Sequence, residues 1–202
     1  MKTFQASILG AAALAVAFAA QAQDYRGQAI SMMKRDFHAH GIATMDRLDE
    51  DTVQRICNLS DNKPPKGLAE TLQHDQLQGI KYPADGKFLG DWKSGEKIAE
   101  NGRGMTWDDK AGQVNGGSCY NCHQIGPAQT SFGTIGNSLL HFGKIRGYGP
   151  DMQKYVYGKI YNAKAFNLCS KMPRFGHSET LTEAQIKDLV ALLLDPNSPV
   201  NK

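Results

Sequence analysis

The segment Cys119-Tyr120-Asn121-Cys122-His123 constrains this chain more than any other part of its sequence. It is a C-x-x-C-H pattern, which is typical of covalent attachment of a c-type haem. Two thiols three positions apart on one helical turn can both reach the vinyl groups of a protoporphyrin, and the histidine that follows lies beneath the iron. The pattern therefore predicts thioether bonds from Cys119 and Cys122 to one haem c, with His123 as an axial ligand of its iron.

Two other uses of such a cysteine pair, and chance, compete with this interpretation. A thioredoxin-like redox pair needs a βαβ pattern around it, and the sequence shows no convincing strand alternation. A zinc site needs a second pair of ligands, and none stands at a suitable spacing. We therefore favour haem c.

The second axial ligand has to come from a more distant segment. Met172 lies in the segment Cys169-Ser170-Lys171-Met172-Pro173-Arg174-Phe175-Gly176, where Pro173 and Gly176 favour an extended loop. We expect Met172 to be this ligand, with His141 as the alternative. Imidazole and thioether together fill both axial positions, which favours electron transfer over substrate binding at the iron.

Residues 112–150 are rich in glycine and have few apolar residues at helical spacing. A segment of this kind does not build a core of its own easily, but it can wrap a large apolar ligand. Arg146 lies near the end of this segment and is a candidate partner of a haem propionate, with a solvated surface arginine as an equal alternative.

The first 22 residues have the pattern of a signal peptide. Lys2 supplies a positive start, an apolar stretch runs from Ile8 to Ala20, and Ala20-Gln21-Ala22 fits a signal peptidase site. The apolar stretch is short for a membrane anchor, and no lipobox-type cysteine follows it. We expect the mature chain to begin near Gln23, to be exported to the periplasm, and to contain no membrane span.

Two cysteines remain after haem attachment, Cys57 and Cys169. An even remainder in an exported protein favours a disulfide between them. Closing so long a segment is worth up to about 4 to 5 kcal/mol in the chain-entropy model. A buried free thiol and a reactive thiol near the haem are the alternatives.

The mature chain is predicted to be all-α. Apolar spacing predicts helices over residues 51–59 and after Pro150, and Ser94 is expected to cap a short helix that ends at Gly102. The C-terminal helix has the clearest local signals. Thr182 and Gln185 form a capping box before it, Ile186, Leu189, Val190 and Leu193 form its apolar stripe, and Pro196 ends it.

We divide the chain into a signal peptide over residues 1–22, an N-terminal extension of mainly helical or irregular structure over 23–89, and a cytochrome c domain over 90–202. The charge balance is close to neutral, with 23 Lys and Arg against 20 Asp and Glu. No local run of basic residues is present, so the sequence gives no indication of nucleic-acid binding.

Several segments between residues 90 and 202 resemble the SoxX family, the small cytochrome c subunits of the SoxAX complex in periplasmic sulfur oxidation. The resemblance lies in the haem site and the opening helix, and most specifically in the methionine segment and the tail. The similar segments are Gly90–Lys97, Gly116–His123, Tyr155–Phe166, Cys169–His177 and Ala191–Pro196.

The resemblance implies a class I cytochrome c fold and a heterodimer with a SoxA-type subunit that carries one or two haems of its own. In that family the complex is an L-cysteine S-thiosulfotransferase, which joins thiosulfate to a cysteine of the SoxYZ carrier. The catalytic cysteine belongs to SoxA. SoxX accepts electrons, and a downstream acceptor receives them. No catalytic residue is then expected on this chain.

One position departs from the class I pattern. Such cytochromes usually carry a Gly-Pro-x-Leu segment whose proline carbonyl orients the ligating histidine, and here the segment is Gly136-Asn137-Ser138-Leu139. We expect the carbonyl of Asn137 to orient His123 in the same way.

Three hypotheses for the function are compared. The chain is a SoxX-type electron-transfer subunit, a free-standing diffusible cytochrome c, or an enzyme that uses Cys169 as a catalytic thiol. The extension before residue 90 favours the first, because a diffusible carrier usually needs only the domain that wraps the haem.

Overall fold

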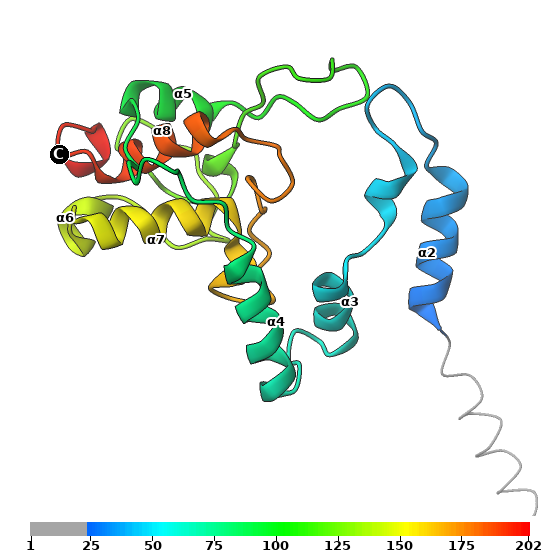
Figure 1. Cartoon of the computed structure of the whole chain (residues 1–202). Coiled ribbons are helices and arrows are strands. Elements are labelled where there is room, and N and C mark those ends of the chain that lie inside the picture. The colour runs from blue at the N-terminus through cyan, green and yellow to red at the C-terminus, as the bar shows by residue number, and fades with distance from the viewer. Residues whose placement is uncertain (1–23) are drawn as a thin grey trace, which may run out of the picture. The chain divides into compact units, whose positions relative to one another are not determined.

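A computed structural model describes residues 24–202, so the expected signal peptide lies outside the described residues. Every regular element in this range is a helix, and the only strand-like pairing there is an isolated bridge between His40 and Ala43 (Figure 1). The all-α prediction is therefore confirmed. No helix within residues 24–202 is long and apolar enough to cross a membrane.

The described chain forms two compact units. The first contains residues 24–39 and 44–48, with helices α2 (Tyr25–Asp36) and η1 (Met45–Leu48), and α2 buries none of its residues. The second unit contains residues 40–43 and 49–202. Residues 49–89, which the sequence analysis assigned to an extension, thus belong to the same compact unit as residues 90–202.

The second unit holds the remaining helices. These are α3 (Thr52–Leu59), α4 (Lys66–Gln78), α5 (Trp92–Glu100), η2 (Cys119–Asn121), α6 (Phe142–Arg146), α7 (Pro150–Tyr161), η3 (Ala163–Ala165), α8 (Glu183–Leu194) and η4 (Pro199–Asn201).

Helix α8 is the centre of the core. The predicted capping box is present, because Thr182 accepts from the Gln185 N–H and the Gln185 side chain accepts from the Thr182 N–H. Burial extends beyond the predicted stripe to Ala191, Leu192 and Leu194, since α8 packs against both α5 and α7 (Figure 1). A helix covered on two sides buries most of its surface.

Helices α5 and α8 cross closely at Gly95. A Cβ atom at Gly95 would lie 2.2 Å from the backbone oxygen of Asp188, so a side chain there has no room. The Gly90 N–H donates to the Lys187 oxygen over 3.0 Å, and the Asp91 N–H donates to the Asp188 carboxylate over 2.8 Å. The first and last helices of residues 90–202 are thereby joined.

The expected cap of α5 was wrong. Asp91, not Ser94, caps the helix, and its carboxylate accepts from the N–H groups of Lys93 and Ser94. Both residue types are favourable caps, but the helix begins three positions earlier than the apolar spacing indicated, which places Ser94 inside its first turn.

Part of the segment that was predicted to be an extension packs into the core. Ile80 and Phe88 are buried there, and the rings of Tyr82 and Phe88 lie 5.9 and 5.6 Å from that of Tyr157 on α7. Aromatic pairs at these separations add to the energy of burial. This explains why residues 49–89 do not form a separate unit.

We expect Gly95→Ala to lower the free energy of unfolding by about 1 to 3 kcal/mol, because the methyl group forces apart two packed backbones. The control is Gly67→Ala on α4, where a Cβ meets nothing within 4 Å. Urea unfolding of the mature protein measures both, and equal stability of the two variants would contradict the close crossing.

Candidate functional site

The C-x-x-C-H motif forms one tight turn. The N–H groups of Cys122 and His123 both donate to the Cys119 oxygen, over 3.1 and 3.0 Å. The turn is joined to the end of α5, because the Gly117 N–H donates to the Ile98 oxygen over 2.8 Å. Cys119 and Cys122 are free thiols, both half-buried, on this turn. The two sulfurs and the His123 ring are therefore carried by one compact piece of backbone.

His123 is oriented by the residue expected to do so. Its Nδ1 lies 2.7 Å from the carbonyl oxygen of Asn137. A carbonyl oxygen can only accept, so Nδ1 carries the proton and Nε2 keeps its lone pair. A lone pair on Nε2 is what an axial imidazole ligand requires.

The chain after the motif runs back alongside it. The N–H groups of Gly133, Gly136 and Leu139 donate to the oxygens of Tyr120, Cys122 and Gln124, over 2.8, 2.8 and 2.7 Å. The glycine-rich segment is thus held by backbone hydrogen bonds to the motif, which a segment without a core of its own needs.

Gly136 leaves the space that the His123 ring occupies. A Cβ atom there would lie 2.2, 2.4 and 2.6 Å from Cε1, Nδ1 and Nε2 of His123. Only glycine lets the backbone lie flat against the imidazole. This close contact and the Asn137 carbonyl together determine the plane of the ring.

A cavity of about 380 Å³ lies next to this ring and is bordered by both expected axial ligands, His123 and Met172. Its volume is in the range of ordinary small-molecule sites. The other walls come from the glycine-rich segment, α6, α7 and α8, and are mostly apolar. They are formed by Asn137, Ser138, Leu139, Leu140, Phe142, Ile145, Arg146, Tyr155, Val156, Lys159, Ile160 and Leu193.

Of the other two expected site residues, Arg146 and His141, only Arg146 borders the cavity. Arg146 borders the cavity from the end of α6 and is exposed, so its guanidinium can reach an anionic group at the cavity mouth. His141, the alternative to Met172, does not border the cavity, and its Nδ1 is buried without a hydrogen-bond partner. The positions therefore favour Met172 over His141.

Lys159, a second cation that borders the cavity, was not predicted from the sequence. Burial lowers the pKa of its ammonium group, and its Nζ lies 5.8 Å from the centre of the Phe166 ring. Its place directly before Ile160 in the apolar pattern of α7 was the only available signal, and lysines at the edge of an apolar helix face are too common for that signal to decide anything.

The surroundings of Cys119 do not favour the redox alternative for the cysteine pair. Burial raises the pKa of the Cys119 thiol to about 12, whereas a reactive thiol of a redox pair needs a lowered pKa. Within residues 24–202 there is no group of three or more His, Cys, Asp or Glu side chains that could hold a metal ion.

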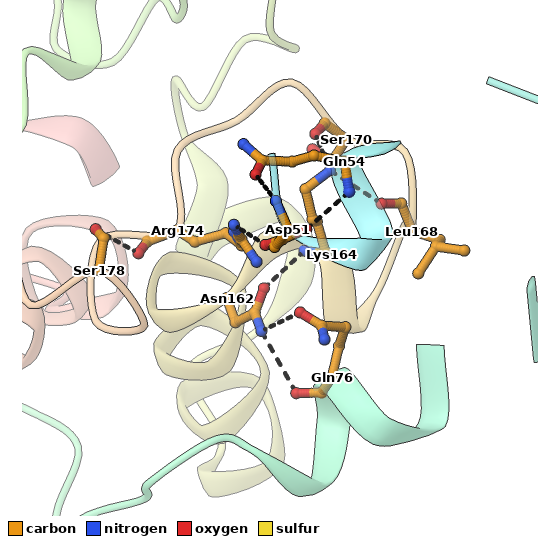
Figure 2. Close-up of polar contacts among 9 residues, drawn as sticks. All are labelled: Asp51, Gln54, Gln76, Asn162, Lys164, Leu168, Ser170, Arg174 and Ser178. Carbon is orange, nitrogen blue, oxygen red and sulfur yellow. Dashed lines mark hydrogen bonds and ion pairs between the residues drawn. The ribbon is translucent and has the colours of Figure 1, made fainter. Parts of the chain in front are cut away.

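The segment that carries Met172 has no regular structure but is tied to α3. Cys169 forms a disulfide with Cys57, the pairing predicted from the sequence, with a Cα–Cα distance of 5.5 Å. On the other side of Met172, the Arg174 guanidinium forms an ion pair with the Asp51 carboxylate. Figure 2 shows Arg174 and Asp51 next to Lys164, whose Nζ donates to the oxygens of Leu168 and Ser170 over 3.2 and 3.4 Å.

The two cations of this network stabilise the Asp51 carboxylate. Desolvation is the largest influence on the Asp51 carboxyl and raises its pKa. The Gln54 N–H, Arg174 and Lys164 together outweigh it, so that the pKa of Asp51 is lowered. Burial, together with the nearby charge of Arg174, lowers the pKa of Lys164. Asp51 therefore stays ionised between two cations.

Comparison with known proteins identifies a relative of this chain. The chain is similar to an uncharacterized lipoprotein of Aquifex aeolicus, with 36% identity over 156 residues, which cover 76% of this chain and 73% of that protein. No protein-family model matches the chain.

We expect Gly136→Ala to tilt the His123 ring, to break its bond to Asn137, and to lower the free energy of unfolding by about 1 to 3 kcal/mol. Gly149→Ala is the matched control, because a Cβ there meets nothing within 4 Å. Denaturant unfolding and the NMR signal of the His123 Nδ1 proton measure the two effects. An unchanged Nδ1 signal in Gly136→Ala would show that the ring does not depend on Gly136.

Proposed function

The chain belongs to the same family as the uncharacterized lipoprotein of Aquifex aeolicus, and we propose that it is an exported electron-transfer protein that binds one haem c covalently. One observation carries the proposal: His123, with Nδ1 bonded to the Asn137 carbonyl, and Met172 border the same mostly apolar cavity, and the turn that carries His123 also carries two free thiols. Covalent haem binding makes use of all four side chains.

Each of these side chains would have a separate role in binding the haem. Cys119 and Cys122 form the thioethers, and His123 and Met172 take the two axial positions. Arg146 and Lys159 lie where they can neutralise propionates. A haem held in this way supplies one-electron transfer at its iron, and thioether ligation favours its reduced state relative to two nitrogen ligands.

The packing also supports a class I cytochrome c fold. A C-terminal helix that packs on the first helix of the haem domain fits such a fold, and α5 and α8 cross closely at Gly95. The motif turn follows α5, and the methionine segment precedes α8. This order of elements is the one the resemblance requires.

We propose further that the chain is the SoxX-type subunit of a heterodimeric L-cysteine S-thiosulfotransferase. The partner would be a SoxA-type cytochrome subunit that carries the catalytic cysteine, and a SoxYZ-type carrier would bind transiently. Exposed apolar side chains at the cavity support a partner surface: Ile145 is 72% and Tyr155 is 36% exposed, and both border the cavity. Apolar groups at the edge of a redox site are suited to a protein interface.

The periplasm is the proposed location. The expected signal peptide supports export, and the relative is named a lipoprotein, which is a class of exported protein. A disulfide between Cys57 and Cys169 fits an oxidising compartment.

Two alternative functions can be distinguished from the proposed one. A free-standing diffusible cytochrome c would use the same haem site without a fixed partner. An enzyme based on Cys169 would need a free thiol, and the disulfide leaves none there.

Replacing the proposed thioether ligand should change the spectrum without preventing haem attachment. We expect Met172→Ala to lose the long-wavelength thioether-to-iron band and to lower the reduction potential by on the order of 0.1 V, a fraction of the range of ~0.8 V that axial ligands span. Met152→Ala is the control, because Met152 packs against the core and does not border the cavity. An unchanged band in Met172→Ala would remove Met172 as the ligand.

The proposed partner is tested by affinity purification of the tagged chain from the periplasm of a sulfur-grown host. A second, larger haem-bearing polypeptide in constant ratio is expected on a gel stained for covalent haem, together with thiosulfate-dependent reduction. A single haem band that is reduced only by other redox proteins would instead indicate the diffusible carrier.

A further inference from the structure

We propose that α3 is the element that keeps Met172 in place as an axial ligand, through ties to the loop on both sides of this residue. The inference rests on the proposed function, because it concerns the Met172 thioether. Residues Asp51, Cys57 and Arg174 are then positioning residues. They would not contact the haem iron themselves, but they would determine the fraction of molecules in which the Met172 thioether is displaced from it.

The first tie is covalent. The Cys57–Cys169 disulfide joins the buried face of α3 to the loop just before Met172. Cys57 is 2% exposed and packs with Val53 and Leu168 in a small core of its own, to which Leu72 of α4 contributes. The anchor is therefore a packed piece of structure, and the disulfide does not join two mobile segments.

The second tie is the ion pair of Asp51 with Arg174, which lies two residues after Met172 in the chain (Figure 2). The Arg174 side chain is only 14% exposed, and its Nη1 is buried without a hydrogen-bond partner. Removing the carboxylate would leave a largely buried guanidinium without its counter-charge, which is strongly unfavourable. The loop would then move to hydrate Arg174.

Lys164 adds a third contact from η3. Its side chain is buried, and its ammonium group donates to the oxygens of Leu168 and Ser170. These hydrogen bonds hold the backbone on both sides of Cys169, and the one to Ser170 lies between the disulfide and Met172. They also place Lys164 beside Asp51, whose charge compensates the buried cation.

Met172 packs against the core, but it also borders two cavities, so packing alone surrounds it incompletely. It borders the cavity next to His123, and it also borders a second cavity of about 410 Å³ between the loop and α3. Cys57, Asn58 and Gln54 of α3 form the far wall of this second cavity. Because a cavity lies on the α3 side, side-chain packing there does not press Met172 towards His123. The disulfide at Cys169 and the ion pair at Arg174 have to keep Met172 in that position.

The consequence is a measurable equilibrium between a ligated and a displaced loop. An added ligand that competes with Met172 binds only to the displaced form, so its apparent dissociation constant falls as the displaced fraction rises. Imidazole is such a ligand, and its binding to the oxidised holoprotein abolishes the long-wavelength thioether band.

The test compares Asp51→Asn with Asp85→Asn in the oxidised holoprotein, by titration with imidazole. Asparagine keeps the N-cap of α3, because it is as good a cap as aspartate, and only the charge is lost. Asp85→Asn makes the same chemical change at the ion pair with Lys187 on α8, away from the loop. We expect imidazole to bind about tenfold more tightly to Asp51→Asn than to the wild type, and within twofold of the wild type to Asp85→Asn.

Equal imidazole affinities of Asp51→Asn and Asp85→Asn would overturn the proposal. The double variant Cys57→Ser/Cys169→Ser gives an independent test of the covalent tie, with the same expected direction and a larger change. If the wild type has covalent haem but no thioether band, the Met172 ligation itself fails, and this inference fails with it. The proposed function and the positioning role of α3 are thus separated by the wild-type spectrum.

Discussion

The close crossing of α5 and α8 is the constraint from which the geometry of the site follows. Because Gly95 lets the two backbones touch, the end of α5 lies where the Gly117 N–H can bond to Ile98, and this bond places the motif turn. From α8, Gln185 donates to the Asn115 oxygen over 2.7 Å, so the same helix also fixes the chain that enters the turn. The side chain of Leu193 then forms part of the cavity wall. A shift at the crossing would therefore move the turn and the wall together.

The features that sequence analysis predicted well are the ones encoded within a few residues. The capping box of Thr182 and Gln185, the helix that follows Pro150, and the contact of Asn137 with His123 all depend on short spacing or on a resemblance over a short segment. Such local signals compete with few alternatives.

The features that could not be predicted depend on partners far apart in the chain. The ion pair of Asp51 and Arg174 carries no local signal, since neither neighbourhood indicates the other. Residues 49–89 were assigned to an extension because they contain many helix breakers, but their aromatic residues complete the core around Tyr157. The wrong cap of α5 has a different cause: two favourable cap residues stand three positions apart, and the contact of Asp91 with α8 decides between them.

Under the proposed function, the long-range contacts around Met172 lie beside the haem ligand that can dissociate. The thioether bonds of Cys119 and Cys122 would be permanent, and the imidazole of His123 comes from the same tight turn, so these three groups stay together once the turn is placed. Met172 would supply the one bond that can dissociate, and it is carried by a loop without regular structure between two cavities. The ties with the largest sequence separation in this region, the Cys57–Cys169 disulfide across 112 residues and the Arg174 ion pair, lie on either side of it. The chain thus has its long-range support at the weakest point of the proposed ligation, where a small change in loop position has the largest effect on the iron.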